Sequence, residues 1–420
     1  MASRLFKRPW TRSNDGSEAT TASRPETPDD DDFHDAEEAV LHPDAHEEGG
    51  LAFNNRELLE SQRSAIYELI RDMGMKFLTG HINLINMSLP VKMFEPRSYL
   101  EKLTDVWVYP ALLTKAASCT DPVERMRWTV TWFVAGLQHV FQSWRKPFNP
   151  LLGETYQASQ PDGSTVQMEQ ISHHPPISAF QITGPGYLFV GHSQPEVTFR
   201  ANAIKTTAKG MRMLHFADGT SIDIVYPAYY MRGILSGTPR GEMVGTARFT
   251  DATHGLVCDV TFGKADGAAP SDRLLNRSDT CTATLCQLDR TNLASAQANS
   301  SASADASQER GWSKRLGGLT GRLTSLSLIN RADNGLPEGS QVIGRGLGNW
   351  LSYFEWDHHR YWSIGESHAT LWQPDPAALP SDCRFREDLV ALRAGDVKQS
   401  QVLKEQLEVR QRQDAKLRKP

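Results

Sequence analysis

Between Thr155 and Leu288 the chain carries many short apolar runs separated by Gly, Pro, Asp and Asn, and this pattern limits the possible fold most strongly. The runs are rich in Val, Ile, Tyr, Phe and Thr, which favour β-strands. Many short strands at such intervals are typical of antiparallel proteins. We therefore expect a large antiparallel sheet that is closed or nearly so, and residues 341–372 return to the same pattern.

Helical patterns flank the strand-rich region. Apolar residues recur at helical spacing within 55–78, and residues 122–144 have the pattern of one long apolar helix. A C-terminal helix is expected over 396–416, with Asp396 as its N-cap. In that helix Lys404, Glu408 and Arg412 are spaced four apart and share one stripe, for which a surface ion-pair ladder is the simplest interpretation.

Net charge and apolar runs exclude several classes of protein. The formal charge of −5 does not indicate nucleic-acid binding. No apolar run approaches the roughly 18 residues that span a bilayer, and the N-terminus lacks a secretory apolar core. The five cysteines are odd in number and scattered, which fits reduced thiols. These features predict a soluble, cytoplasmic protein.

Residues 1–50 are polar and poor in large apolar side chains, so we expect a disordered tail. Within it, 25–50 holds eleven Asp or Glu and no Lys or Arg. The acidic segment 32–38 contains one aromatic residue and resembles the FFAT motif, which binds the MSP domain of VAP proteins on the endoplasmic reticulum. The matching residues are Asp32, Phe33, Asp35, Ala36 and Glu38, with His34 where the motif usually has a second aromatic. The alternative is an acidic tail without a partner.

An insertion is expected over 291–336, and its first part, 291–311, is low-complexity Ala, Ser, Asn and Gln. Its second part predicts an amphipathic helix over 312–326. The apolar residues there are spaced four, three, four and three: Trp312, Leu316, Leu319, Leu323 and Leu326. Such a helix could lie in a membrane interface. Packing on its own domain is the alternative.

The segment EQISHHPP, 169–176, carries adjacent histidines followed by two prolines, which restrict the backbone. For His173 and His174 to reach one ligand, either the chain must bend here or the ligand must be bulky, and a phosphate group suits this geometry better than a single metal ion does. The competing interpretations are surface histidines, or a metal site with Glu169, which lacks a third ligand. The pair at 358–359 lacks prolines and is expected in a solvated turn.

A second segment, KPFNPLLGE at 146–154, contains two prolines and a glycine and predicts a rigid loop that holds Lys146. Both segments resemble the fingerprints of oxysterol-binding protein-related lipid-transfer proteins, and EQISHHPP differs from the usual form only at Ile171. SLPV at 88–91, LPSDCR at 379–384 and the K-x3-E-x3-R helix are also similar. The resemblance covers roughly 80–290 and 370–418.

The resemblance implies an α+β, mainly β fold: a near-complete antiparallel barrel around a central apolar tunnel, with an N-terminal lid and C-terminal helices. The domain would span 51–420, with 51–86 as the lid. The family's pleckstrin-homology and ankyrin modules have no room in this chain, so a short form is expected.

The resemblance also implies a ligand, phosphatidylinositol 4-phosphate. Its headgroup would be bound at the motif positions Lys146, Asn149, His173, His174, Lys404, Glu408 and Arg412. A second lipid, sterol or phosphatidylserine, would be exchanged for it between membranes, at contact sites of the endoplasmic reticulum. A lipid sensor or scaffold without net transport is the alternative. A hydrolase using a histidine as base is disfavoured, because no serine or cysteine nucleophile motif is present. We expect no enzymatic activity, no cofactor, no metal and no nucleic-acid partner.

Overall fold

The computed structural model describes residues 40–73, 82–83, 89–141, 143–200, 202–264, 276–288 and 340–418. The FFAT-like segment 32–38, the amphipathic segment 312–326 and most of the expected disordered tail therefore lie outside the described residues. The described residues belong to one compact unit.

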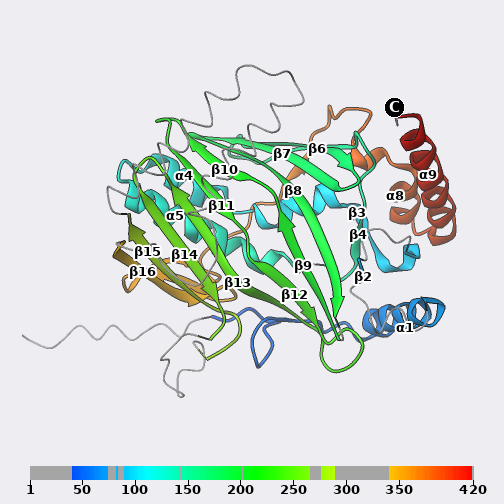
Figure 1. Cartoon of the computed structure of the whole chain (residues 1–420), viewed down its shortest axis with the longest axis horizontal. Coiled ribbons are helices and arrows are strands. Elements are labelled where there is room, and N and C mark those ends of the chain that lie inside the picture. The colour runs from blue at the N-terminus through cyan, green and yellow to red at the C-terminus, as the bar shows by residue number, and fades with distance from the viewer. Residues whose placement is uncertain are drawn as a thin grey trace, which may run out of the picture. The chain divides into compact units, whose positions relative to one another are not determined.

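One antiparallel sheet dominates this unit (Figure 1). Within the described residues it contains 17 strands. Their bounds are β1 Leu51–Ala52, β2 Ile82–Asn83, β5 Thr155–Ser159, β6 Thr165–His173, β7 Pro176–Gly184, β8 Tyr187–Arg200, β9 Ala203–Lys209, β10 Arg212–Phe216, β11 Ser221–Val225, β12 Ala228–Arg232, β13 Arg240–Asp251, β14 Leu256–Phe262, β15 Thr280–Gln287, β16 Gln341–Asn349, β17 Tyr353–Trp356, β18 His359–Ser363 and β19 Gln373–Pro374.

Two long strands make the sheet curl. β8 pairs with β7 on one side, and on its other side with β10 at its start and β9 at its end. β13 likewise pairs with both β11 and β12 before it meets β14. Among the described strands β18 pairs with β17 and β19 pairs with β5, and no residue register joins β18 to β19 or to β5. The expected mainly β fold with a large antiparallel barrel is confirmed.

Six described α-helices accompany the sheet: α1 Arg56–Met73, α3 Tyr99–Leu103, α4 Pro110–Ser118, α5 Pro122–Gly136, α8 Glu387–Arg393 and α9 Val397–Leu417. α5 begins with Asp121, whose side chain accepts from the backbone N–H of Val123. Its Trp132 and Phe133 pack edge-on against Phe189 and Phe249 of the sheet, with ring centroids 5.4 and 5.3 Å apart. Most side chains from Arg125 to Ala135 of α5 are buried. None of the described helices is long and apolar enough to cross a membrane.

The single helix expected over 122–144 is wrong in its second half. α5 ends at Gly136 and continues only as a 3-10 turn, Leu137–His139. A side chain at Gly136 would lie 2.1 Å from the carbonyl oxygen of Val106, so glycine is needed for this close approach. The aromatic residues beyond the turn, Phe141 and Trp144, line a cavity instead of a helix face.

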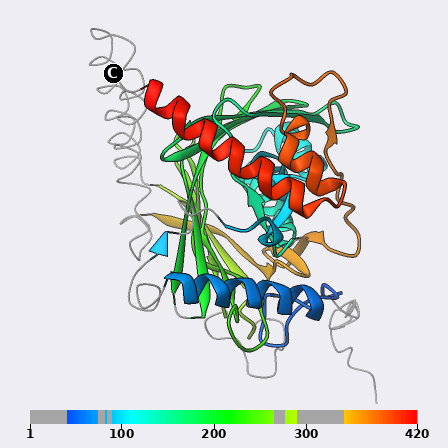
Figure 2. The ribbon, with the colours of Figure 1, turned by 90° about the vertical axis from the view of Figure 1, so that its right-hand side faces the viewer.

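Helices α1 and α9 both cross one end of the barrel, as Figure 2 shows. The helices expected over 55–78 and 396–416 thus correspond to α1 and α9. The Asp396 side chain accepts from the backbone N–H of Gln399, which confirms the expected N-cap. This end of the barrel carries the candidate site.

Candidate functional site

The turn between β6 and β7 holds the two histidines of EQISHHPP. β6 ends at His173, β7 begins at Pro176, and the His174–Pro175 peptide is cis. Gln170 fixes the turn, because its amide donates to the carbonyl of Ser172 (2.8 Å) and its carbonyl accepts from Ser178 Oγ (2.5 Å). The expected bend is therefore a tight hairpin turn, and the two imidazole centroids lie 4.6 Å apart.

His173 keeps an unused polar atom in this turn. Its Nδ1 is buried and has no hydrogen-bond partner among the described residues. Burial lowers the pKa of His173, and the neighbouring His174 lowers it further, while the carbonyl of Pro150 acts in the opposite direction. A buried polar atom without a partner is costly, so Nδ1 is a free site for a ligand atom.

The KPFNPLLGE segment is only partly the expected loop. Residues Lys146–Phe148 form strand β4, which pairs in parallel with β3, Phe94–Ser98. The pairing uses Lys146 and Phe148, so the missing N–H of Pro147 does not interrupt it. The prediction of a loop over 146–148 was wrong because the partner strand lies far away in sequence.

Beyond β4 the segment is a loop held by Arg386, which sequence reasoning missed. This guanidinium donates to the carbonyl of Asn149 (2.8 Å) and to Glu154 (2.9 Å), and it pairs with Asp388 (2.7 Å). Glu154 also accepts from the backbone N–H of Leu151 (2.9 Å). The only sequence signal for Arg386 was its place two residues after LPSDCR.

Two ammonium groups approach the same aromatic ring at this site. Lys146 Nζ lies 4.8 Å and Lys404 Nζ 5.4 Å from the ring centroid of Phe94. Lys146 also donates to the side-chain oxygen of Asn149 at 2.5 Å. Burial lowers the pKa of Lys146 to about 7, with Lys404 and Arg386 adding to the effect and Glu408 opposing it.

The stripe predicted on the C-terminal helix is present in α9. Lys404 donates to Glu408 at 2.5 Å, and Arg412 lies 3.9 Å from the other Glu408 oxygen. Lys404 is only 5 % exposed, whereas the Arg412 side chain is 64 % exposed. The ladder is therefore not a surface feature at its Lys404 end, because this ammonium is buried against the site.

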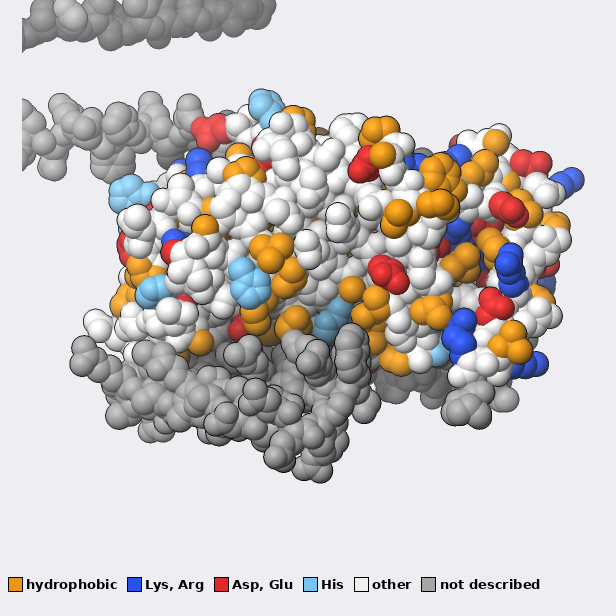
Figure 3. All heavy atoms as spheres, turned by 90° about the horizontal axis from the view of Figure 1, so that it is seen from above, with side chains coloured by type: hydrophobic (Ala, Val, Ile, Leu, Met, Phe, Trp, Pro, Cys, Tyr) orange, Lys and Arg blue, Asp and Glu red, His pale blue; other side chains and the backbone are white. Residues whose placement is uncertain are grey.

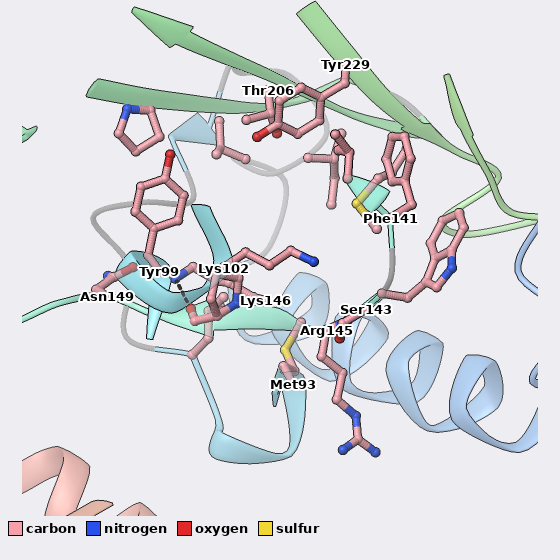
Figure 4. Close-up of a pocket in the computed structure, with 18 of the residues that line it drawn as sticks. Met93, Tyr99, Lys102, Phe141, Ser143, Arg145, Lys146, Asn149, Thr206 and Tyr229 are labelled. Atoms are coloured by element: carbon pink, nitrogen blue, oxygen red, sulfur yellow. Dashed lines mark hydrogen bonds between the residues drawn. The ribbon is translucent and has the colours of Figure 1, made fainter. Parts of the chain in front are cut away.

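Two cavities of different character meet at the histidine turn. One is a polar pocket of about 650 Å³ between the turn and α9, lined by Lys404, Glu408 and Arg412. The other is a mainly apolar tunnel of about 260 Å³, lined by Lys146 and by side chains of α1 and the sheet. Asn149, His173 and His174 line both. Figure 4 shows Lys146, Asn149 and Lys102 on one side of the tunnel and Thr206 and Tyr229 on the other.

The structure thus brings all seven predicted site residues to one junction. Gln411, on α9, is a further residue of the polar pocket that the motif spacing did not predict. Its Nε2 is buried and has no hydrogen-bond partner in the described part of the chain. The unpartnered amide N–H of Gln411, together with the ammonium of Lys404 and the guanidinium of Arg412, makes this pocket suitable for a group with several acceptor oxygens.

The rim of the polar pocket is both apolar and basic. Leu152 and Ile171 line it and are 37 % and 50 % exposed, and Leu417, at the end of α9, is 85 % exposed. Lys416 and Arg418 also line the pocket. Figure 3 shows Lys and Arg side chains gathered toward the end of the molecule that carries α8 and α9.

Helix α1 closes one side of the tunnel with Leu59, Gln62 and Ile66. Its Arg63 donates to three backbone carbonyls of the β12–β13 loop, those of Ile234 (3.1 Å), Gly233 (2.9 Å) and Gly237 (2.5 Å). The helix is therefore fixed by polar contacts along one loop, while its apolar face covers the tunnel.

The second histidine pair lies away from this site. Asp357 and His358 have positive φ angles of 46° and 69° in the turn between β17 and β18. His358 and His359 are exposed, as predicted for a solvated turn. Among the described residues no group of three or more His, Cys, Asp or Glu side chains is placed to hold a metal ion.

A near-complete barrel with an apolar tunnel that opens beside a polar, cation-lined pocket defines the class of domain. The model of the oxysterol-binding protein family matches residues 75–420. The chain is 31% identical to oxysterol-binding protein 9 of Dictyostelium discoideum over 378 residues, which cover 88% of this chain and 79% of that protein. It is 30% identical to mouse oxysterol-binding protein-related protein 8 over 252 residues, 56% of this chain and 28% of that protein.

Solved structures share the fold. The Osh3 ORD from Saccharomyces cerevisiae, in complex with PI(4)P, superposes with a TM-score of 0.60 at 19% identity and covers 90% of this chain and 88% of its own. The Osh1 ORD domain in complex with cholesterol gives 0.62 at 20% identity, covering 91% and 84%. This chain belongs to the oxysterol-binding protein family, as the sequence motifs predicted.

Proposed function

We propose that this protein binds phosphatidylinositol 4-phosphate with its headgroup in the polar pocket and its acyl chains in the apolar tunnel, and exchanges it for a second lipid between membranes. The observation that carries the proposal is the junction of the two cavities at Asn149, His173 and His174. A phosphoinositide matches this arrangement, because its anionic headgroup suits the polar pocket and its apolar tails suit the tunnel.

The pocket residues have complementary roles in this proposal. The cations of Lys146, Lys404 and Arg412 neutralise phosphate, the histidines donate to it, and Glu408 accepts from inositol hydroxyls while it orients Lys404. Each charge-assisted hydrogen bond contributes about 1.5–3 kcal/mol. Several together are needed to draw a headgroup away from a hydrated membrane surface.

The tunnel explains why transport is feasible. A 16-carbon chain exposed to water costs about 12 kcal/mol, at about 0.8 kcal/mol per methylene. Transfer from a bilayer into an apolar tunnel is close to neutral, provided that a lid excludes water. We assign the lid to 51–86, with α1 as its described helix, and expect sterol or phosphatidylserine as the second lipid. The relatives supply precedents, since Osh ORD structures were solved with PI(4)P, with ergosterol and with cholesterol.

The test is transfer of the phosphoinositide from donor to acceptor liposomes. We expect the His173→Ala/His174→Ala variant to lose exchange. The other histidine pair offers a matched control, because His358→Ala/His359→Ala removes two exposed imidazoles from a remote turn. Equal transfer by wild type and the 173/174 variant would refute the proposal. Binding without transfer would support a sensor or scaffold, and release of a hydrolysed product would support an enzyme, which we do not expect.

We place the exchange in the cytoplasm, at contact sites of the endoplasmic reticulum. The support is the FFAT-like segment with Asp32, Phe33, Asp35, Ala36 and Glu38. A peptide of this segment is expected to bind a VAP MSP domain, and Phe33→Ala and Asp35→Ala are expected to weaken the complex. Identical binding by all three peptides would contradict this assignment.

Membrane contact is expected through the apolar and basic rim of the pocket and through 312–326. A peptide of 309–332 should float with anionic or loosely packed liposomes. Absence of flotation with both kinds of vesicle would assign this segment to packing on its own domain.

A further inference from the structure

The apolar tunnel continues into a smaller cavity of about 100 Å³, whose mainly apolar wall includes a few polar side chains. Tyr99, Lys102, Val140 and Tyr229 line both spaces, so the small cavity is the inner end of the tunnel. Trp132 and Phe133 of α5 close it, and Arg212 of β10 lies in its wall. The inner end is thus mainly apolar, like the rest of the tunnel, and Arg212 places a cation in its wall.

Arg212 is the unusual residue of this inner end. It is 4 % exposed, and its guanidinium donates to the carbonyls of Ala208 (2.9 Å) and Gly210 (3.1 Å) and lies 4.2 Å from the ring centroid of Tyr226. No carboxylate of the described residues forms an ion pair with it. Burial lowers the pKa of Arg212, and only tyrosines act in the opposite direction. A buried cation without a counter-ion is destabilising unless something else compensates.

The other polar groups of the inner end include hydroxyls and the Lys102–Asp105 pair. The hydroxyl of Tyr99 shares a hydrogen bond with Ser193 Oγ (2.9 Å), whereas the hydroxyl of Tyr229 has no hydrogen-bond partner among the described residues. Lys102 lies 3.0 Å from Asp105, but that carboxylate already accepts two hydrogen bonds from Arg97. Among the described cations that line the inner end, Lys102 therefore has a carboxylate partner and Arg212 has none.

We infer that the inner end of the tunnel binds the carboxylate of a long-chain fatty acid, whose alkyl chain extends toward the histidine turn. Arg212 supplies the charge and Tyr229 a hydrogen bond, while the apolar walls take the methylenes. The inference rests on the proposed function only in that the tunnel must admit an alkyl chain. The orientation is opposite to that proposed for the phosphoinositide, whose polar end stays at the mouth.

Stability measurements separate this role from a structural one. If Arg212 served only to fix the carbonyls of Ala208 and Gly210, Arg212→Met would lower the melting temperature. If the cation is retained for a ligand, replacing it with a flexible apolar side chain leaves the melting temperature of the ligand-free protein unchanged or raises it. A lower melting temperature of this variant would therefore count against the inference.

The binding test compares laurate with dodecanol, which have the same chain length and differ in charge. We expect the wild type to bind laurate at least about tenfold more tightly, the ratio that one charge-assisted hydrogen bond produces. Arg212→Met should abolish the preference, and Arg212→Lys should restore part of it. The control is Arg360→Met, a surface arginine paired with Glu355, which should keep the wild-type ratio.

Two results would overturn the inference. One is a wild type that binds both amphiphiles equally. The other is a preference that survives Arg212→Met but disappears in His173→Ala/His174→Ala, since the carboxylate would then lie at the mouth. Neither result affects the proposed phosphoinositide exchange. Conversely, a wild type that does not transfer the phosphoinositide but still prefers laurate to dodecanol would refute the proposed function and leave this inference standing.

Discussion

The low pKa of Lys146 makes headgroup binding dependent on pH above neutrality. Burial lowers this pKa to about 7 in the ligand-free protein. A bound phosphate favours the charged ammonium and raises the pKa again, so binding above pH 7 takes up a proton. The phosphate does not obscure the effect, because its second pKa lies near 6. His173 does not obscure it either, since its pKa is lowered below 6.5.

The magnitude follows from the fraction of charged Lys146. About half of Lys146 is charged at pH 7 and about 1% at pH 9, so the dissociation constant should rise by up to about fiftyfold between these pH values, or about 2.3 kcal/mol. Calorimetry with a soluble short-chain phosphoinositide, in two buffers of different ionisation enthalpy, measures both affinity and proton uptake. Lys146→Arg should bind with little pH dependence over this range, because a guanidinium stays charged.

The free energy of unfolding of the ligand-free protein should rise with pH, whereas the affinity for the headgroup falls. Unfolded Lys146 has a pKa near 10.5, so between about pH 7 and 10.5 the unfolded chain binds more protons than the folded one. Stability then rises with pH over this window, and the rise should be smaller in Lys146→Met. A dissociation constant that stays flat from pH 7.5 to 9, with no proton uptake, would refute the reasoning and place the Lys146 ammonium in water.

Three further predictions concern residues that the motifs did not include. Arg386→Met leaves the buried carboxylates of Glu154 and Asp388 without their cation and should lower the free energy of unfolding in urea by about 3–5 kcal/mol. The exposed Arg360→Met should cost under about 1 kcal/mol, and equal costs would show that Arg386 does not hold the loop. Arg63→Ala removes three carbonyl contacts and should speed amide exchange in α1, and unchanged protection there would show that apolar packing alone holds the helix. Gln411→Leu should weaken headgroup binding about three- to tenfold at unchanged stability, because it removes one neutral hydrogen bond; wild-type affinity would exclude a contact.

Much of the fold follows from local pattern. The alternation of buried and exposed residues in β6 is strict from Thr165 to Gln170, which is why the strands could be predicted without knowing their neighbours. The closure of the sheet is different, since it depends on β8 and β13 each meeting two partners on one side. β8 and β13 are 14 and 12 residues long, and their length was the only local sign of this arrangement.

The candidate site shows the same division. His173 and Lys146 were found because prolines mark their segments. Sequence reasoning did not find the parallel pairing of β3 with β4 or the contact of Arg386 with Glu154. Each joins segments far apart in the sequence, and neither has a local pattern. Arg212 was also missed, since an arginine on a strand is ordinarily assumed to face water.

The two ends of the tunnel present different polar groups to a ligand, and this difference affects how the protein could exchange one lipid for another. The mouth offers three cations, two imidazoles and an amide to a headgroup that stays outside the tunnel. The inner end offers Arg212 and Tyr229 to a small acceptor that must enter first. Two amphiphiles in opposite orientations would place their chains in the same apolar space, so binding of one excludes the other. Competition between such ligands then needs no conformational signal between the sites, because the shared volume of the tunnel alone couples them.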